Sequence, residues 1–247
     1  MFPKFWRSNS ATRRYRVPDR QRVYAVGDIH GRLDLLDPLL ERIAADARNG
    51  AKLEISYVFL GDYVDRGPAS RGVIERLVGF GADRKTIYLK GNHEALLLDF
   101  LQSPGKLQEW CRFGGLDTLT SYGLRPALRP TAAQCAEIAA ELSRAMPESH
   151  RDFLQNLSLS LTFGDFFFVH AGVRPNVALD RQSEKDLLWI RDEFLRHRQS
   201  FDKIVVHGHS PVQQPEVLDN RINIDTGAYA TGQLTCLVLE GEDFRFL

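Results

Sequence analysis

The chain has 247 residues, of which 43 % are hydrophobic and 26 % charged, as in ordinary soluble globular proteins. This excludes a fibrous or intrinsically disordered chain, and the length suits one large α/β domain or two smaller ones. Lysine plus arginine equals aspartate plus glutamate at 32 each, so no net field favours nucleic acid or an acidic membrane surface.

The N-terminal segment is rich in lysine and arginine and contains one acid, Asp19. We expect residues 1–21 to form a disordered or loosely packed basic tail, and residues 22–247 to form a single domain. No signal-peptide pattern is present, and no apolar stretch reaches the roughly 18 residues of a membrane span, so we expect a cytoplasmic protein. The cysteines have no C-x-x-C spacing and are expected to be reduced packing residues: Cys111, Cys135 and Cys236.

The first half of the chain alternates short apolar runs with helical segments, and each run ends at a loop that contains glycine. Strands are predicted at residues 22–26, 56–60 and 86–89, and helices at residues 33–49, 70–80 and 95–101. This alternation is typical of a mostly parallel sheet with helices outside it. Because loops at the carboxyl ends of parallel strands meet at one edge, we expect their polar residues to lie close together.

The middle and the end of the chain differ from this pattern. Residues 103–156 are helix-forming but interrupted by proline and glycine, and are predicted to form an inserted helical cap. Short strands follow at residues 157–163, 166–169, 203–206, 216–218, 221–224 and 234–240, with a hairpin signal at Gly164-Asp165. The expected fold is therefore α/β, a four-layer α-β-β-α sandwich of two packed mixed sheets flanked by helices.

Five of the seven histidines lie just after a predicted strand, within four residues of its end, and have glycine nearby: His30, His93, His170, His207 and His209. Histidines placed for surface reasons would not follow this pattern. Asp28 and His30 are two residues apart in an extended segment, so both side chains point to the same side and could hold one cation. Asp28 could equally cap the following helix.

Two further loops carry polar side chains. The loop after the second strand supplies Asp62, Asp65 and Arg66, in which the arginine could bind a phosphate or close the loop as an ion pair. The loop after the third strand supplies Asn92, a plausible hard metal ligand, and His93, a plausible proton donor near neutral pH. Each loop alone has a structural explanation, but their combination favours a functional site.

These five motifs, in this order, resemble the phosphoprotein phosphatase (serine/threonine protein phosphatase) family of the calcineurin-like metallophosphoesterases. The resemblance extends from about Val23 to Tyr229. Asp65, Arg66 and Glu94 resemble the protein-phosphatase subgroup, and the short length resembles its bacterial and phage members.

The resemblance implies two divalent metal ions, manganese first, with iron or zinc as alternatives. It assigns Asp28 and His30 to the first ion and Asp62 to both. It assigns the second ion to Asn92, His170 and His209. Together the ions would activate a shared hydroxide that attacks phosphorus directly.

The resemblance also implies roles for residues around the metal ions. His93 would protonate the leaving alkoxide, oriented by Asp65, while Arg66 and Asn92 would bind the phosphoryl oxygens. A later arginine is expected to join them, and the candidates are Arg191, the better match, and Arg174. His207 is expected to be a hydrogen-bonding group behind His209.

The reaction so implied is dephosphorylation of phosphoserine or phosphothreonine, with a phosphorylated protein or peptide as partner and neither nucleic acid nor membrane. One alternative is a symmetrical dinucleoside tetraphosphate hydrolase, which typically has aspartate where this chain has Glu94. Another is an inactive metal-containing module that binds phosphoproteins. The sequence indicates neither the physiological substrate nor an oligomeric state.

Overall fold

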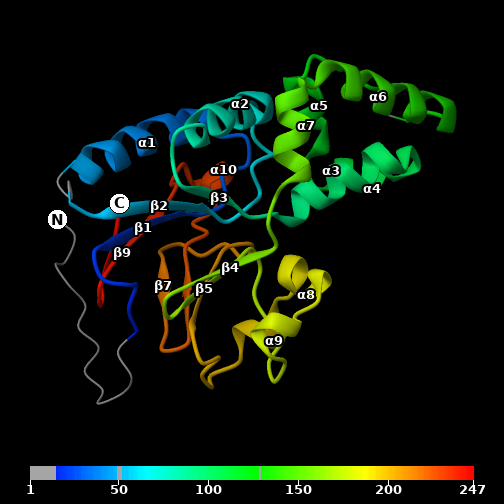
Figure 1. Cartoon of the computed structure of the whole chain (residues 1–247). Coiled ribbons are helices and arrows are strands. Elements are labelled where there is room, and N and C mark those ends of the chain that lie inside the picture. The colour runs from blue at the N-terminus through cyan, green and yellow to red at the C-terminus, as the bar shows by residue number, and fades with distance from the viewer. Residues whose placement is uncertain (1–14, 49–51, 128) are drawn as a thin grey trace.

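The computed structural model describes residues 15–48, 52–127 and 129–247, which contain two sheets of five strands each (Figure 1). The first sheet has the order β10-β9-β1-β2-β3 and the second the order β4-β5-β6-β8-β7. The first comprises β1 (Gln21–Val26), β2 (Glu54–Phe59), β3 (Thr86–Tyr88), β9 (Cys236–Glu240) and β10 (Asp243–Phe246). The second comprises β4 (Ser160–Phe163), β5 (Phe166–Val169), β6 (Ile204–His207), β7 (Glu216–Val217) and β8 (Arg221–Asn223).

Both sheets are mixed. In the first, β1, β2 and β3 pair in parallel, whereas β9 pairs antiparallel with both of its neighbours, β1 and β10. In the second, β5, β6 and β8 run parallel, while the edge strands β4 and β7 run antiparallel. The predicted hairpin between β4 and β5 is present. In each sheet, the carboxyl ends of three parallel strands therefore lie along one edge.

The two sheets face each other across a hydrophobic core. In β1, Val23 and Ala25 point into this core, whereas Tyr24 and Val26 point towards the helices on the other face. This is the two-residue period of a strand that is buried on both faces. Phe166 of β5 reaches the same core from the second sheet.

Helices cover both outer faces of the sandwich (Figure 1). The first sheet is covered by α1 (Leu33–Arg48) and α2 (Ser70–Gly81), and α3 (Asn92–Gln102) leads away from its edge. The second is covered by α8 (Glu184–Trp189) and α9 (Asp192–Leu195), which follow the 3-10 helix η2 (Leu179–Arg181). The short α10 (Ala228–Thr231) lies between β8 and β9. The predicted four-layer sandwich is confirmed.

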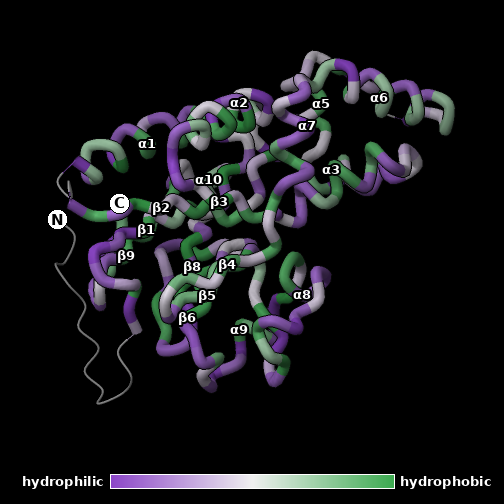
Figure 2. Tube along the Cα trace, viewed as in Figure 1, coloured by the Kyte–Doolittle hydropathy of each residue, from purple (hydrophilic) through white to green (hydrophobic). Residues whose placement is uncertain are grey.

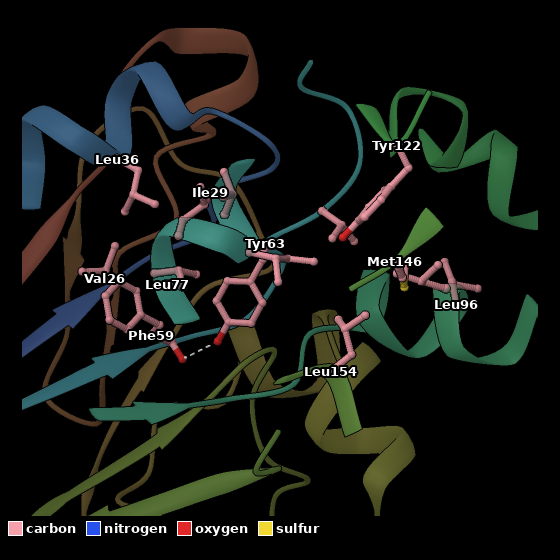
Figure 3. Packing of buried hydrophobic residues seen from close by; sticks show 14 of the residues in the cluster. Val26, Ile29, Leu36, Phe59, Tyr63, Leu77, Leu96, Tyr122, Met146 and Leu154 are labelled. Carbon is pink, nitrogen blue, oxygen red and sulfur yellow. Dashed lines mark hydrogen bonds between the residues drawn. The ribbon is translucent and has the colours of Figure 1, made fainter. Parts of the chain in front are cut away.

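The described part of residues 103–156 is helical, as predicted, with η1 (Pro104–Lys106), α4 (Leu107–Arg112), α5 (Gly115–Ser121), α6 (Ala132–Ala145) and α7 (Glu148–Gln155). Tyr122 and Leu154 of this segment belong to one core cluster with Phe59 and Leu77 of the sandwich (Figure 3). Along α6, hydrophobic residues alternate with hydrophilic ones, as expected of a helix with one buried side (Figure 2). The inserted segment and the sandwich therefore share one hydrophobic cluster.

The predicted basic tail needs correction at its end. Residues 1–14 lie outside the described part of the chain. Val17, however, is fully buried, and its N–H donates to the carbonyl oxygen of Gly241 at 3.0 Å. The N–H of Arg16 donates to a carboxylate oxygen of Asp165 at 3.0 Å. Residues just before 22 are therefore part of the folded body rather than loosely packed.

Two predicted boundaries shift by three residues, more than the others do. The helix α3 begins at Asn92 rather than at residue 95, because the Glu94 carboxylate accepts the N–H of Gly91 at 2.9 Å and closes the first turn. The strand β4 begins at Ser160 rather than at residue 157, because Ser158 pairs with Leu89 of the first sheet. Asn92 and His93 therefore lie in the first turn of a helix.

None of the helices in the described ranges combines the length and the apolar composition needed to cross a bilayer. The three cysteines are unpaired thiols. Cys135 and Cys236 are buried and Cys111 is half-buried, which is consistent with a packing role.

Candidate metal centre

The six predicted metal ligands follow the carboxyl ends of parallel strands from both sheets. Asp28 and His30 follow β1, Asp62 follows β2, Asn92 follows β3, His170 follows β5 and His209 follows β6. All six are buried, with exposed fractions between 0 and 5 %. Polar side chains so thoroughly buried need partners that replace water.

Three of these residues have a left-handed backbone: His30 (φ 47°), Asp62 (φ 52°) and His209 (φ 65°). Residues with a Cβ rarely adopt this conformation, and it persists where the surroundings fix it. Here the N–H of His30 donates to the carbonyl oxygen of Asp62 at 2.8 Å. The N–H of His209 donates to a carboxylate oxygen of Asp28 at 3.0 Å. These two hydrogen bonds therefore connect the loop after β1 with the loops after β2 and β6.

The first group of possible ligands consists of His30, Asp62 and His93, whose candidate atoms lie within 4.8 Å of one another. His30 donates Nδ1–H to the carbonyl oxygen of Val64 at 2.9 Å, which leaves Nε2 3.4 Å from Asp62 Oδ2. Burial lowers the pKa of His30 to about 3, so the ring is neutral and Nε2 carries a lone pair. A lone pair facing a carboxylate calls for a cation between them.

The second group consists of Asp62, His170 and His209, again within 4.8 Å. His170 donates Nδ1–H to the carbonyl oxygen of Leu60 at 2.9 Å, so its Nε2 faces Asn92 Oδ1 at 2.9 Å and Asp62 Oδ1 at 3.4 Å. Burial lowers the pKa of His170, which leaves these three lone pairs without a proton. Nδ1 of His209 lies 2.8 Å from the same Asn92 oxygen. Asp62 is common to both groups.

Two buried side-chain atoms that lack a hydrogen-bond partner in the described part of the chain also fit metal ions. Asp28 Oδ1 and His209 Nε2 are buried and have no hydrogen-bond partner among the described residues. Burial, together with repulsion from Asp225 and Asp62, raises the pKa of Asp28 well above its usual range. Burial lowers the pKa of His209 to about 2, which keeps it in the neutral form that binds metals. The nitrogen and oxygen donors therefore fit two divalent cations, and manganese, iron and zinc all accept such donors.

His93 differs from the other histidines of the site. Its Nδ1–H donates to Asp65 Oδ2 at 2.8 Å, and its Nε2 accepts from Arg66 at 3.1 Å and lies 3.8 Å from Asp62 Oδ2. Burial lowers its pKa, but Asp62 and Asp65 raise it, and the balance is upward. His93 is therefore a member of the first group that is also suited to carrying a proton.

The two candidate arginines have different surroundings. Arg174 forms ion pairs with Asp186 at 2.7 Å and Glu193 at 3.0 Å, away from the ligand groups. Arg191 donates to the carbonyl oxygen of His209 at 3.3 Å. The geometry therefore favours Arg191 as the second arginine of the site.

His207 is a hydrogen-bonding group, as expected, and its partners are Gly208 and Arg221. Its Nδ1–H donates to the carbonyl oxygen of Gly208 at 3.0 Å, and its Nε2 accepts from Arg221 at 3.2 Å. Arg221 in turn pairs with Glu216 at 2.6 Å. Both ring nitrogens thus serve the second sheet rather than the ring of His209.

Two residues at the centre were not identified from the sequence. Asp225 is a buried carboxylate after β8 that accepts the N–H of Gly227 at 2.9 Å. Its position after a parallel strand was an available signal. Tyr229 is 39 % exposed, with its ring centroid 5.4 Å from that of His30 and 4.7 Å from the guanidinium carbon of Arg66. No local pattern marks Tyr229, because its exposure depends on where α10 lies.

A family model described as calcineurin-like phosphoesterase matches residues 21–230. Among curated proteins, the bis(5'-nucleosyl)-tetraphosphatase PrpE (asymmetrical) of Anoxybacillus flavithermus is 26 % identical over 232 residues, which cover 86 % of this chain and 88 % of the relative.

Two solved structures share the fold. A candidate diadenosine tetraphosphatase superposes with a TM-score of 0.64 at 22 % identity and covers 92 % of this chain and 93 % of its own. A cold-active protein-tyrosine phosphatase of a psychrophilic Shewanella superposes with a TM-score of 0.59 at 16 % identity, covering 95 % and 80 %. Proteins with nucleotide and protein phosphatase names therefore share this architecture, so the fold alone does not identify the substrate.

Proposed function

The chain belongs to the calcineurin-like phosphoesterase family, and we propose that it hydrolyses dinucleoside tetraphosphates with the aid of two divalent cations. The observation that carries the proposal is that Asp62 belongs to both ligand groups, so that two cations would lie close enough to act on one phosphoryl group. The name of the PrpE relative supports the substrate class. The alternative drawn from the motifs is thereby preferred to protein dephosphorylation.

The ligand groups suggest how the cations would be held. We assign Asp28 and His30 to one cation, Asn92, His170 and His209 to the other, and Asp62 to both. When bound, the cations would lower the pKa of solvent water and neutralise charge on the phosphoryl oxygens. Manganese is the first choice on donor chemistry, with iron or zinc as alternatives.

Arg66 would exchange partners when substrate binds. Without substrate it donates to Nε2 of His93 at 3.1 Å. A phosphoryl oxygen is a stronger, charged acceptor, so we expect Arg66 to turn to it and release Nε2. Arg191, which lies between α8 and α9, would bind the same phosphoryl group. With Nδ1–H fixed on Asp65, His93 would then take a proton from solvent on the released Nε2, as its raised pKa favours, and would give that proton to the leaving oxygen.

Tyr229 gives structural support for a nucleotide substrate. Its half-exposed ring borders His30, and exposed aromatic rings are common platforms for stacked bases. A base on Tyr229 would place the attached phosphate chain near Arg66, which lies over the same ring. A phosphorylated serine side chain would gain little from this surface.

The position of cleavage is a further part of the proposal. The relative's name specifies asymmetrical cleavage, which yields a nucleoside monophosphate and a nucleoside triphosphate. The alternative considered from the sequence was symmetrical cleavage, which yields two diphosphates. We propose the asymmetrical product pair.

The proposal is tested by parallel assays of the manganese-loaded protein on diadenosine tetraphosphate, a phosphoserine peptide and p-nitrophenyl phosphate. We expect the highest kcat/KM for the dinucleotide, and AMP plus ATP as products by chromatography. Two ADP molecules would favour symmetrical cleavage. Preference for the peptide would restore protein dephosphorylation, and no turnover of any substrate would favour a binding module.

A further inference from the structure

We infer that Trp110 and Thr118, from the helical segment of residues 103–156, position Asp65 and through it His93, so that this segment is part of the proton-transfer apparatus. The inference rests on the proposed phosphoester hydrolysis but not on which phosphoester is cleaved. Trp110 lies on α4 and Thr118 on α5, 45 and 53 residues from Asp65 along the chain.

Three donors hold the Asp65 carboxylate. Oδ2 accepts from His93 Nδ1 at 2.8 Å and from Trp110 Nε1 at 2.9 Å. Oδ1 accepts from the hydroxyl of Thr118 at 2.6 Å. All four residues are fully buried, so water does not compete for these bonds. Two of the three donors come from the inserted segment.

Thr118 also holds the backbone of Asp65. Asp65 has a left-handed conformation, φ 70°, which is unfavourable for a residue with a Cβ. Its N–H donates to Thr118 Oγ1 at 2.9 Å and to Ser70 Oγ at 3.1 Å. One hydroxyl of the inserted segment therefore contacts both the backbone and the carboxylate of Asp65.

These bonds fix the plane of the Asp65 carboxylate and thereby the orientation of the His93 ring. With Oδ2 aimed at Nδ1, His93 keeps its proton on that nitrogen, and Nε2 is directed towards Arg66 and Asp62. A carboxylate free to rotate would orient the ring less well, and small misplacements of a proton donor are costly in rate. Trp110 and Thr118 are positioning residues, because neither is placed to touch the substrate.

The turn between α4 and α5 supports the same arrangement. A Cβ on Gly115 would lie 2.4 Å from an atom of the Trp110 ring, and a Cβ on Gly114, whose φ is 103°, would lie 2.7 Å from Arg66 N. The carbonyl oxygen of Gly114 accepts the N–H of Arg66 at 3.4 Å. The sequence pattern indicated Gly114 and Gly115 only as an interruption of the helices. In the structure they allow Trp110 and Arg66 to approach the backbone closely.

Ordinary core packing is the competing explanation for Trp110, since its ring stacks on Phe100 at 5.1 Å. Trp110→Phe distinguishes positioning from core packing, because it keeps an aromatic ring and removes the N–H. Thr118→Val keeps the shape and removes the hydroxyl, while Thr118→Ser keeps the hydroxyl. Thr120→Val is the matched control, because the hydroxyl of this exposed neighbour donates to the carbonyl oxygen of Leu116 in its own helix.

The first test measures kcat of the manganese-loaded variants on a series of alkyl and aryl phosphates. Removing general-acid assistance matters most for poor leaving groups. We expect Thr118→Val and Trp110→Phe to lower kcat about tenfold or more for alkyl phosphates and less than about threefold for p-nitrophenyl phosphate. Thr118→Ser and Thr120→Val should stay close to the unaltered protein. Equal losses on all leaving groups, or no losses, would overturn the inference.

The second test needs no metal. The Nδ1 proton of His93, identified by its loss in His93→Asn, should give a downfield NMR signal that shifts or broadens in Thr118→Val and Trp110→Phe but not in Thr120→Val. An unchanged signal in both variants would overturn the inference. Should Trp110→Phe fail to fold, Thr118→Val carries both tests. Hydrolysis of p-nitrophenyl phosphate without hydrolysis of the dinucleotide would refute the proposed substrate and leave these comparisons intact.

Discussion

Glu94 illustrates how a single residue can suggest the wrong substrate. Its glutamate side chain was one feature that favoured a protein phosphatase over a tetraphosphatase. In the structure it is fully buried, and its carboxylate accepts backbone N–H groups of Asp62 and Gly91 at 2.9 Å and of Tyr63 at 2.7 Å. Glu94 therefore braces the metal-binding loop and is not placed to read the substrate.

Replacement of Glu94 should lower the stability of the fold. We expect Glu94→Ala to reduce the free energy of unfolding by about 2–5 kcal/mol, because several buried N–H groups lose their acceptor. Glu94→Gln, which keeps one acceptor oxygen, should lose less. Urea unfolding measures both. If Glu94→Ala keeps full stability yet changes the preferred substrate, the bracing role is wrong.

The role of His93 leads to a prediction about leaving groups. We expect His93→Asn to lower the rate on a phosphoserine peptide by about 100-fold or more, since the departing alkoxide needs a proton. Rates on p-nitrophenyl phosphate and diadenosine tetraphosphate should fall much less, because phenolate and phosphate leave more readily. Steady-state kinetics on the three substrates provide the measurement, and equal losses on all three would refute the role.

Tyr229 makes the substrate proposal testable at one side chain. We expect Tyr229→Ala to raise KM for diadenosine tetraphosphate about tenfold, in line with roughly 1–3 kcal/mol for a stacked base. Tyr229→Phe keeps the ring and should behave like the unaltered protein. Values for p-nitrophenyl phosphate, which has no base, should change little in either variant. A similar rise in KM for both substrates would argue against a base platform.

At the scale of whole elements, local patterns predicted most of the strands and the loops that follow them. A short apolar run that stops at Gly-Asp or Gly-Asn marks the end of a buried strand, and this rule located Asp28, Asp62 and Asn92. Parallel pairing of β1, β2 and β3 then brings these loops together. The four-layer fold and the convergence of the first three loops followed from these local signals, whereas the full set of six ligands came from the family resemblance.

Contacts between distant segments were not predictable in this way. Nothing near Thr118 or Trp110 in sequence indicates that they reach Asp65, because that contact depends on how α4 and α5 pack. Val17 looked like part of a charged tail, since its burial comes from pairing with Gly241 at the far end of the chain. Single-sequence patterns report periodicity and turns but not which surfaces meet.

The helices on the second sheet offer a pH test at an ion pair that contains none of the predicted metal ligands. The hydrogen bond from Arg174 lowers the pKa of Asp186 below its ordinary value. Since the pKa in the folded state lies below that in the unfolded chain, the pair stabilises the fold above about pH 4. This stabilisation is lost as the pH falls through the lowered pKa.

We therefore expect Asp186→Asn to lower Tm at neutral pH and to approach the Tm of the unaltered protein in strong acid. Thermal unfolding from pH 2 to pH 7 provides the measurement. Asp192→Asn, which breaks an exposed pair with Arg196, serves as the control and should have little effect at any pH. A difference in Tm for Asp186→Asn that does not vary with pH would contradict the assignment.

At the scale of the whole molecule, the candidate ligands come from both sheets. Loops after β1, β2 and β3 supply one part, and loops after β5 and β6 supply the rest. Bound cations would therefore link the two sheets at one edge and relieve repulsion among the buried carboxylates of Asp28, Asp62 and Asp225. Stability of the entire fold should depend on metal.

We expect chelation to abolish hydrolysis and to lower Tm by about 5–10 °C. A cation present at 100 times its Kd stabilises the native state by about 2.7 kcal/mol, and a protein of this size shifts by about 2–4 °C per kcal/mol. Manganese should restore both properties. Asp62→Asn is the control, and its Tm should respond little to manganese. A Tm that chelation leaves unchanged in the unaltered protein would argue against the linkage.

The spread of the ligands along the chain affects how the protein could mature on the ribosome. The early ligands Asp28, His30, Asp62 and Asn92 all lie within the first 92 residues, whereas His170 and His209 emerge only when most of the polypeptide is complete. A nascent chain would thus expose part of a chelating site before its counterpart exists. Full occupancy by metal would come only after translation has nearly finished, so hydrolysis could not begin in an unfinished copy.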